Sequence, residues 1–197
     1  MNDHYHRLSE SLGYRSRAAF KLRQIVAKFD VIENGDVVVD LGCYPGGWLQ
    51  VAISKVGEDG FVYGVDLRTV KQISAPNVTT AHLDVEDERS ASLILNALPR
   101  KADVVLSDLA PGMSGVYHVD HFRQMALARA ALRIATAVLR PGGNCVLKVF
   151  EGDMLRGFES DVSRTFASYK RFKPNASRKR SSELYLICFS FKSPNLP

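Results

Sequence analysis

Short apolar runs alternate with longer stretches of mixed polarity along most of this chain. The apolar runs are rich in Val and Leu, a composition typical of buried strands. They predict strands at residues 37–41, 61–66, 78–83, 103–108, 144–150 and 184–191. Between them, patterns of helical period predict helices at about 14–29, 46–56, 86–98, 119–140 and 153–166. The Pro-Gly-Gly sequence at 141–143 is expected to end the longest helix.

This alternation is typical of an α/β fold, in which helices cover both faces of a mostly parallel sheet. No internal repeat or low-complexity tract interrupts it, so a single domain is expected over residues 1–197. Ligands of such sheets bind outside the carboxyl ends of the strands. Polar residues end the apolar runs here, namely Asp40, Asp66, Asp84, Asp108 and Lys148. We therefore expect the functional site along this edge of the sheet.

The composition excludes several classes of protein. Apolar residues make up 46% of the chain and charged residues 24%, which is ordinary globular usage and argues against a mainly disordered chain. No apolar run approaches the roughly 18 residues of a membrane span, and residues 1–13 are too polar for a signal peptide. Three widely spaced cysteines, Cys43, Cys145 and Cys188, indicate buried thiols in the reducing cytoplasm rather than disulfides.

Positive charge is distributed unevenly, although the net charge is only +5. Residues 1–28 contain six basic and two acidic side chains, and residues 164–183 contain seven basic and one acidic. The segment between them, residues 29–163, has 12 basic and 18 acidic side chains. The two basic stretches are either separate solvated faces or, if the fold brings them together, one anion-binding surface.

A glycine-rich loop follows the first predicted strand, in the sequence Asp40-Leu-Gly-Cys-Tyr-Pro-Gly-Gly-Trp48. Its glycine spacing differs from the G-x-G-x-x-G pattern of dinucleotide sites, which disfavours a bound diphosphate. Asp66, 24 residues after Gly42, is placed to accept hydrogen bonds from ribose hydroxyls, and Asp84 could receive an amino group such as that of adenine. This set predicts an adenosine-bearing ligand, with S-adenosylmethionine as the obvious candidate. The alternative is a tight strand–helix turn without a ligand.

The sequence resembles the FtsJ/RrmJ family of ribose 2′-O-methyltransferases from about Tyr14 to Lys192. The matching segments are residues 15–22, 39–48, 106–115, 146–150, 173–178 and 182–185. Two departures lie near the expected donor site: Cys43-Tyr44 replaces the usual Ala-Ala, and Gly112 stands where Asn is common. The resemblance implies a Rossmann-like class I methyltransferase fold with a seven-stranded, mostly parallel sheet, and S-adenosylmethionine as the methyl donor.

The same resemblance assigns the site residues. The catalytic set falls on Lys21, Asp108, Lys148 and Glu183. The methyl donor is expected at Gly42, Gly46, Gly47, Trp48, Asp66, Asp84 and Asp108. A ribose 2′-hydroxyl is almost fully protonated at neutral pH, so catalysis needs alignment and a way to remove its proton. Lys148 is expected to act as the general base if it is neutral, or to stabilise the developing alkoxide if it is charged.

The acceptor is expected to be RNA, bound through its phosphates by Arg15, Arg17, Arg178, Lys179 and Arg180. A uridine of large-subunit ribosomal RNA in the assembled subunit is the leading substrate. Transfer RNA is the alternative substrate, and a largely non-catalytic ribosome assembly factor is the alternative function. Tyr14, Phe20, Tyr169 and Phe172 are available for base stacking, although core packing is the simpler expectation for them.

Metal ions, membranes and partner copies are not expected to take part. His118 and His121 lie close in the sequence but lack the cysteines or the His-Glu pair of a metal site, so we expect them on a surface or loop. The protein is predicted to act as a cytoplasmic monomer.

Overall fold

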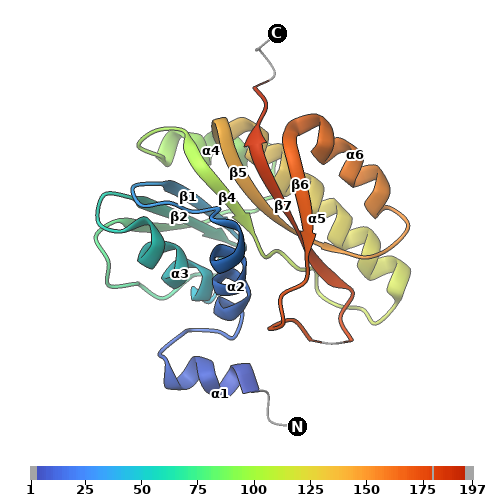
Figure 1. Cartoon of the computed structure of the whole chain (residues 1–197), viewed down its shortest axis with the longest axis horizontal. Helices are drawn as coiled ribbons and strands as arrows, with labels where there is room; N and C mark the ends of the chain where they lie inside the picture. Colours follow the sequence, from blue (N-terminus) through green and yellow to red (C-terminus); the bar gives the residue numbers. More distant parts are fainter. Residues whose placement is uncertain (1–3, 179, 194–197) are drawn as a thin grey trace.

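A seven-stranded sheet forms the centre of the computed structural model, which describes residues 4–178 and 180–193 (Figure 1). The strands are β1 (Val37–Leu41), β2 (Phe61–Asp66), β3 (Val78–His82), β4 (Ala102–Ser107), β5 (Leu139–Phe150), β6 (Phe166–Phe172) and β7 (Glu183–Phe191). Their order across the sheet is β3-β2-β1-β4-β5-β7-β6. Strands β1 to β5 pair in parallel, and β7 pairs antiparallel with both β5 and β6. The predicted α/β fold is confirmed.

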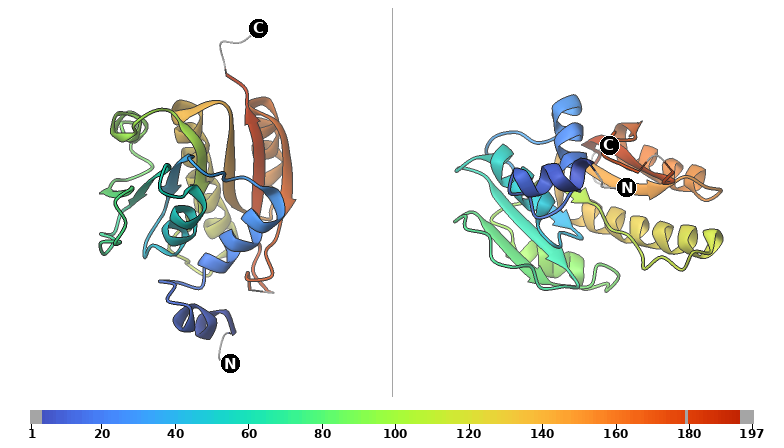
Figure 2. Two further views of the ribbon diagram at one scale, coloured as in Figure 1. Left: turned by 60° about the vertical axis from the view of Figure 1, so that its left-hand side comes forward. Right: turned by 90° about the horizontal axis from the view of Figure 1, so that it is seen from below.

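Helices cover both faces of this sheet (Figure 2). They are α1 (His4–Ser11), α2 (Ala19–Phe29), α3 (Gly47–Val56), α4 (Ser90–Ala97), α5 (Tyr117–Val138) and α6 (Leu155–Thr165). Successive strand residues point to opposite faces, so Val38 packs with α2 and α3, whereas Val39 packs with α4, α5 and α6. Both faces of the central strands are therefore buried, which explains their continuous apolar sequences.

Two elements lack a signal in the hydrophobic pattern. Helix α1 is short, and Ser9 is its only buried residue, so no apolar period marks it. It lies beyond α2, at the same end of the molecule as the loop between β6 and β7 (Figure 1). Strand β6 is an edge strand with mainly exposed side chains, and its first residue, Phe166, was expected to end a helix.

Two predicted boundaries are also wrong. Helix α2 begins at Ala19 rather than near residue 14. Helix α5 ends at Val138, before the Pro-Gly-Gly sequence, and β5 begins at Leu139. The pairing of β5 with β4 shifts between Ala102 and Val104, so the Pro-Gly-Gly residues lie in an irregular part of the strand.

The three cysteine side chains lie in the interior of the protein. Cys43, Cys145 and Cys188 are all buried free thiols, as their apolar surroundings predicted. No helix in the described part of the chain combines the length and the hydrophobicity that crossing a membrane requires.

Asp103 joins several segments at the amino end of the sheet, opposite the expected functional edge. Its carboxylate accepts a hydrogen bond from the backbone N–H of Val37 at 2.7 Å and pairs with Arg100 at 2.6 Å and with Arg140. Burial alone would raise the pKa of Asp103, but these hydrogen bonds and the guanidinium charges hold it below the usual value. An ionised Asp103 therefore fixes the start of β1 against β4.

Replacing Asp103 with Asn should lower the free energy of unfolding by about 2 kcal/mol at neutral pH, because the charged hydrogen bonds are lost. The pKa of Asp103 is lower in the folded protein than in the unfolded chain, so its carboxylate stabilises the fold at pH values above the unfolded-state pKa. This stabilisation disappears as the pH falls through the folded-state pKa. The difference between wild type and variant should therefore shrink in acid. Urea unfolding at neutral and acidic pH measures it. Asp87→Asn, at an exposed pair with Arg89, is the control and should change little; an equal loss in both variants would contradict the assignment.

Candidate active site

The functional edge of the sheet carries polar residues from six strands. Since β1 to β5 are parallel, their carboxyl ends lie together, and antiparallel β7 begins at the same edge. In sheet order, the row contains Asp84 after β3, Asp66 in β2, the loop after β1, Asp108 after β4, Lys148 in β5 and Glu183 in β7. The expected donor residues occupy one half of this row, and the expected catalytic residues occupy the other.

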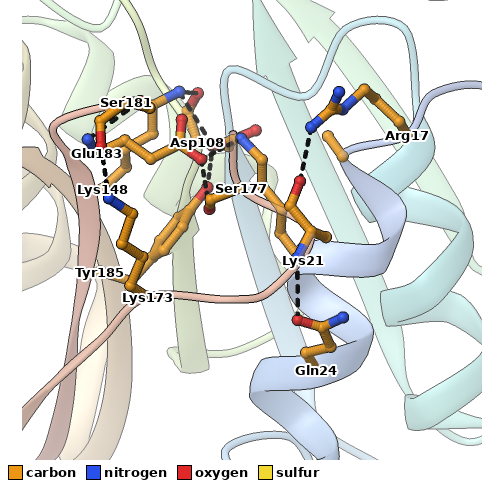
Figure 3. Close-up of polar contacts among 12 residues, drawn as sticks. Arg17, Lys21, Gln24, Asp108, Lys148, Lys173, Ser177, Ser181, Glu183 and Tyr185 are labelled. Atoms are coloured by element: carbon orange, nitrogen blue, oxygen red, sulfur yellow. Dashed lines mark hydrogen bonds and ion pairs between the residues drawn. The ribbon is translucent and has the colours of Figure 1, made fainter. Parts of the chain in front are cut away.

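Four charged side chains form two ion pairs in the catalytic half (Figure 3). Lys21 Nζ lies 2.6 Å from Glu183 Oε1, and Lys148 Nζ lies 3.1 Å from Asp108 Oδ1. Lys148 also donates to the backbone carbonyl of Asp108 at 3.1 Å. Ser177 Oγ donates to Glu183 Oε1 at 2.7 Å. The exposed fraction of the four charged side chains is between 7% and 15%, so the pairs are largely shielded from water.

Tyr185 is a further member of this cluster that the sequence analysis did not assign. Its hydroxyl donates to Asp108 Oδ1 at 2.6 Å, and its side chain is fully buried. Burial, the negative charges of Asp108 and Glu183, and the hydrogen bond to Asp108 raise the pKa of Tyr185 well above the usual value, so it remains a donor. Tyr185 is the register partner of Lys148 across β5 and β7, a pairing that the sequence alone does not specify.

Asp108 stays ionised within this cluster. Burial by itself would raise the pKa of Asp108, but the positive charges of Lys148 and Lys21 and the hydrogen bonds from Tyr185 and Lys148 hold it below the usual value. The carboxylate therefore serves as the common counter-charge for two lysines that come from α2 and β5.

Packing around the cluster explains how these side chains are held. Gln124 on α5 donates to the backbone carbonyl of Lys148 at 3.0 Å. Trp48 on α3 donates from its indole N–H to the carbonyl of Ala18 at 2.8 Å, and its ring lies 5.8 Å from that of Tyr185. The Trp48 side chain is thus part of the core, and only its backbone at the start of α3 is left to meet a ligand.

A cavity of about 340 Å³ opens beside the catalytic cluster. We call it the catalytic cavity; its lining consists of Arg17, Ala18, Lys21, Ala110, Met113, Lys148, Phe150, Arg178, Ser181 and Glu183. The two basic stretches of the sequence therefore meet at one site, as an anion-binding surface requires. Arg180, two residues after Arg178, is exposed to solvent but does not line the cavity. Lys179 lies outside the described residues.

Arg17 donates to the backbone carbonyl of Ala176 at 2.6 Å and lines the catalytic cavity. Arg15 also binds backbone carbonyls, but it does not line the cavity. Its guanidinium donates to the backbone carbonyls of Pro45, Lys71 and Gln72 at 3.3, 2.5 and 2.6 Å. These contacts use the guanidinium to connect the glycine-rich loop with the segment after β2. The interpretation of Arg15 as a phosphate ligand therefore finds no support in its contacts, and we leave it out of the RNA surface below.

The glycine-rich loop contains three positions where a Cβ would crowd neighbouring atoms. Gly46 is buried at φ +114°, and a Cβ there would lie 3.0 Å from the Arg15 side chain. Gly42 has φ +79°, and a Cβ would lie 3.3 Å from Leu109 Cα. Gly47 packs against Ser16, where a Cβ would come within 2.3 Å of the hydroxyl oxygen, so protein packing already accounts for this glycine.

The acidic residues of the donor half lie in different environments. Asp66 accepts hydrogen bonds from the backbone N–H groups of Tyr44 at 3.0 Å and Arg68 at 2.9 Å. Asp84 is exposed and accepts from the N–H of Glu86 at 2.9 Å. Both carboxylates retain acceptor capacity for hydroxyl or amino groups of a ligand.

Asp40 is completely buried, and neither carboxylate oxygen has a hydrogen-bond partner among the described residues. Burial and the nearby negative charges of Asp108 and Asp66 raise the pKa of Asp40 well above the usual value. This shift favours the neutral form of Asp40 over a further negative charge between the donor and catalytic halves.

Comparisons with known proteins agree with this arrangement. Residues 14–191 match the profile of FtsJ-like methyltransferases. A ribosomal RNA large subunit methyltransferase E from Methanothrix thermoacetophila is 48% identical over 94% of this chain and 71% of its own length. The protein of the same name from Cenarchaeum symbiosum is 45% identical over 96% and 95%. A ribosomal RNA methyltransferase from Plasmodium falciparum has a similar structure, with a TM-score of 0.77 and 25% identity over 90% of this chain and 98% of that one.

Replacing Tyr185 with Phe should cost about 1–3 kcal/mol of unfolding free energy, because Asp108 loses a buried donor. The same change should move the pKa of Asp108 upward, since one of the hydrogen bonds that lowers it is removed. Urea unfolding and an NMR titration of the Asp108 carboxyl measure the two effects. Tyr63→Phe is the matched control, because the Tyr63 hydroxyl makes no hydrogen bond within the described residues. Identical behaviour of the two variants would rule out this role for Tyr185.

Proposed function

This chain belongs to the FtsJ-like methyltransferase family, and we propose that it transfers a methyl group from S-adenosylmethionine to a ribose 2′-hydroxyl in large-subunit ribosomal RNA. The observation that carries the proposal is the pair of ion pairs, Lys21 with Glu183 and Lys148 with Asp108, at the rim of a basic cavity. They lie on the same edge of the sheet as the glycine-rich loop, so a donor held by that loop and an acceptor in the cavity would meet at Asp108.

The donor half fits an adenosine-bearing sulfonium ligand. Gly42 and Gly46 have positive φ values, which the tight turn from β1 into α3 requires, and the first N–H groups of α3 lack helical partners. Asp66 and Asp84 stand at neighbouring strand ends and supply carboxylate acceptors for ribose hydroxyls and an amino group. When bound, the sulfonium supplies an already activated methyl group.

In the catalytic half, we assign the handling of the hydroxyl proton to Lys148. Its Nζ lies 3.1 Å from the Asp108 carboxylate and is largely shielded from water. Lys21 and Glu183 orient the incoming ribose and balance each other's charge. Asp108 fixes Lys148 at the side of the cavity that faces the donor loop.

The acceptor is proposed to be RNA because both basic stretches reach the catalytic cavity. Arg17 and Arg178 line it, and Arg180 extends the positive surface. Lys179 is proposed for the same surface from the sequence alone. The relatives' names favour ribosomal RNA of the large subunit, and we retain a uridine in the assembled subunit as the specific target. A ribosomal substrate and three buried thiols fit a cytoplasmic site of action, and action as a monomer remains a prediction.

The deciding experiment incubates the protein with methyl-labelled S-adenosylmethionine and, separately, large ribosomal subunits, isolated large-subunit rRNA and tRNA. Label should enter large-subunit rRNA, and the modified nucleotide should resist alkaline cleavage because its 2′-hydroxyl is blocked. Label in tRNA alone would show that tRNA, and not rRNA, is the substrate of the same methyl transfer. Tight RNA binding without label in any RNA would instead support an assembly factor.

Lys148→Met should lower the rate of methyl transfer about 10²- to 10⁴-fold, the usual contribution of a positioned base, while donor affinity stays within a few-fold. Lys148→Arg should lose as much, because arginine keeps the charge but does not accept a proton. Single-turnover rates and donor binding by calorimetry measure these effects. Substantial activity in the arginine variant would assign Lys148 to alkoxide stabilisation.

A further inference from the structure

A second cavity of about 230 Å³ adjoins the catalytic cavity. We call it the side cavity; its lining consists of Met113, Gly115, Tyr117, Asp120, His121, Phe150 and Ser182. Met113 and Phe150 line both cavities, and the neighbouring residues Ser181 and Ser182 line one each. The two hollows are therefore parts of one continuous surface, the first mainly basic and the second mainly apolar and aromatic.

Tyr117 presents a large aromatic surface in the side cavity. It is 54% exposed, although it lies at the start of α5 beside the catalytic residues. Its hydroxyl donates to the backbone carbonyl of Glu151 at 3.1 Å, and its ring is parallel to that of His121, with an interplanar angle of 2° and ring centres 6.0 Å apart. The ring is thus held in place before any ligand arrives, which lowers the entropic cost of stacking on it.

His121, which was expected on a surface or loop, is instead buried on α5, where it supports this ring. Its Nε2 accepts a hydrogen bond from the backbone N–H of Met154 at 3.3 Å, so the proton of the neutral imidazole is on Nδ1. Nδ1 is buried and has no partner in residues 4–178 and 180–193. A Cβ on Gly152 would lie 2.5 Å from the His121 ring, so only glycine leaves this ring its place. The His121 ring therefore forms a closely packed, buried part of the side-cavity wall.

The loop that carries Met113 is also fixed. Asp120 accepts hydrogen bonds from the N–H and hydroxyl of Ser114, both at 2.7 Å, and from the N–H of Gly115 at 3.0 Å. These bonds hold the loop against the start of α5. Met113 itself is 65% exposed, and its flexible side chain reaches both cavities.

We propose that the side cavity binds a nucleobase of the RNA strand next to the reacting ribose, by stacking on Tyr117 and packing against Met113 and Phe150. This proposal rests on the proposed function, because the continuous surface then receives phosphates at Arg17 and Arg178 and a base beside them. Aromatic stacking suits a base, since every base has a flat π-face.

The test measures kcat/KM for the accepted RNA and KM for the methyl donor in wild type, Tyr117→Leu and Tyr117→Phe. Loss of the ring in the leucine variant should lower kcat/KM for RNA about tenfold, a typical contribution of one stacked base, without changing KM for the donor. The phenylalanine variant keeps the ring and should stay within about twofold of wild type. Phe122→Leu is the matched control, because Phe122 is 63% exposed on the same helix and lines neither cavity.

RNA with an abasic nucleotide on either side of the methylated one supplies the second arm. One of the two abasic substrates should lower the wild-type rate about as much as Tyr117→Leu does, and combining it with that variant should cause little further loss. The side-cavity proposal would be overturned if Tyr117→Leu left kcat/KM for RNA unchanged. It would also be overturned if the losses caused by this variant and by the abasic substrate were fully additive. A loss confined to whole subunits, absent with isolated rRNA, would assign the face to a ribosomal protein instead. Absence of methyl transfer by wild type would refute the proposed function itself. Thermal midpoints of the Tyr117 and Phe122 variants equal to that of wild type would exclude misfolding as the cause of any loss.

Discussion

The carboxylate of Asp108 neutralises the charge of the catalytic lysines and also joins the strands and the helix that surround them. Lys21 and Lys148 are both largely buried, and a buried cation without a counter-charge costs several kcal/mol. Asp108 pairs directly with Lys148, lies within the field of Lys21 and accepts the hydroxyl proton of Tyr185. Its interactions connect β4, β5, β7 and α2, so the catalytic arrangement and the packing around it depend on the same group.

The two ends of the sheet serve different purposes. At the amino end, the carboxylate of Asp103 binds the backbone N–H at the start of β1 and pairs with two arginines, which fixes the positions of the strands. At the carboxyl end, the strand order places the donor residues in one half of the row and the catalytic lysines in the other. Antiparallel β7 is essential to this arrangement, because only a strand that begins at the functional edge brings Glu183 and Tyr185 to it.

Much of the fold and of the site was predictable because buried parallel strands leave a strong apolar signal and end in polar residues. All four expected catalytic side chains do meet in the structure. Helix α1 and strand β6 were missed because polar, partly exposed elements carry little hydrophobic period. Arg15 and Arg17 were predicted as RNA ligands from their charge, which does not reveal that both guanidinium groups also bind backbone carbonyls.

The sequence by itself determined six of the seven strands, the glycine-rich loop, the acidic strand ends and the two basic stretches, since these depend on local composition and spacing. Only the tertiary structure decided which charges pair, that Tyr185 supports Asp108, and that Tyr117 and His121 form a fixed aromatic wall beside the cavity. These contacts join residues far apart in the chain or depend on how loops pack. Their distances follow from the packing of helices on the sheet, which no local pattern specifies.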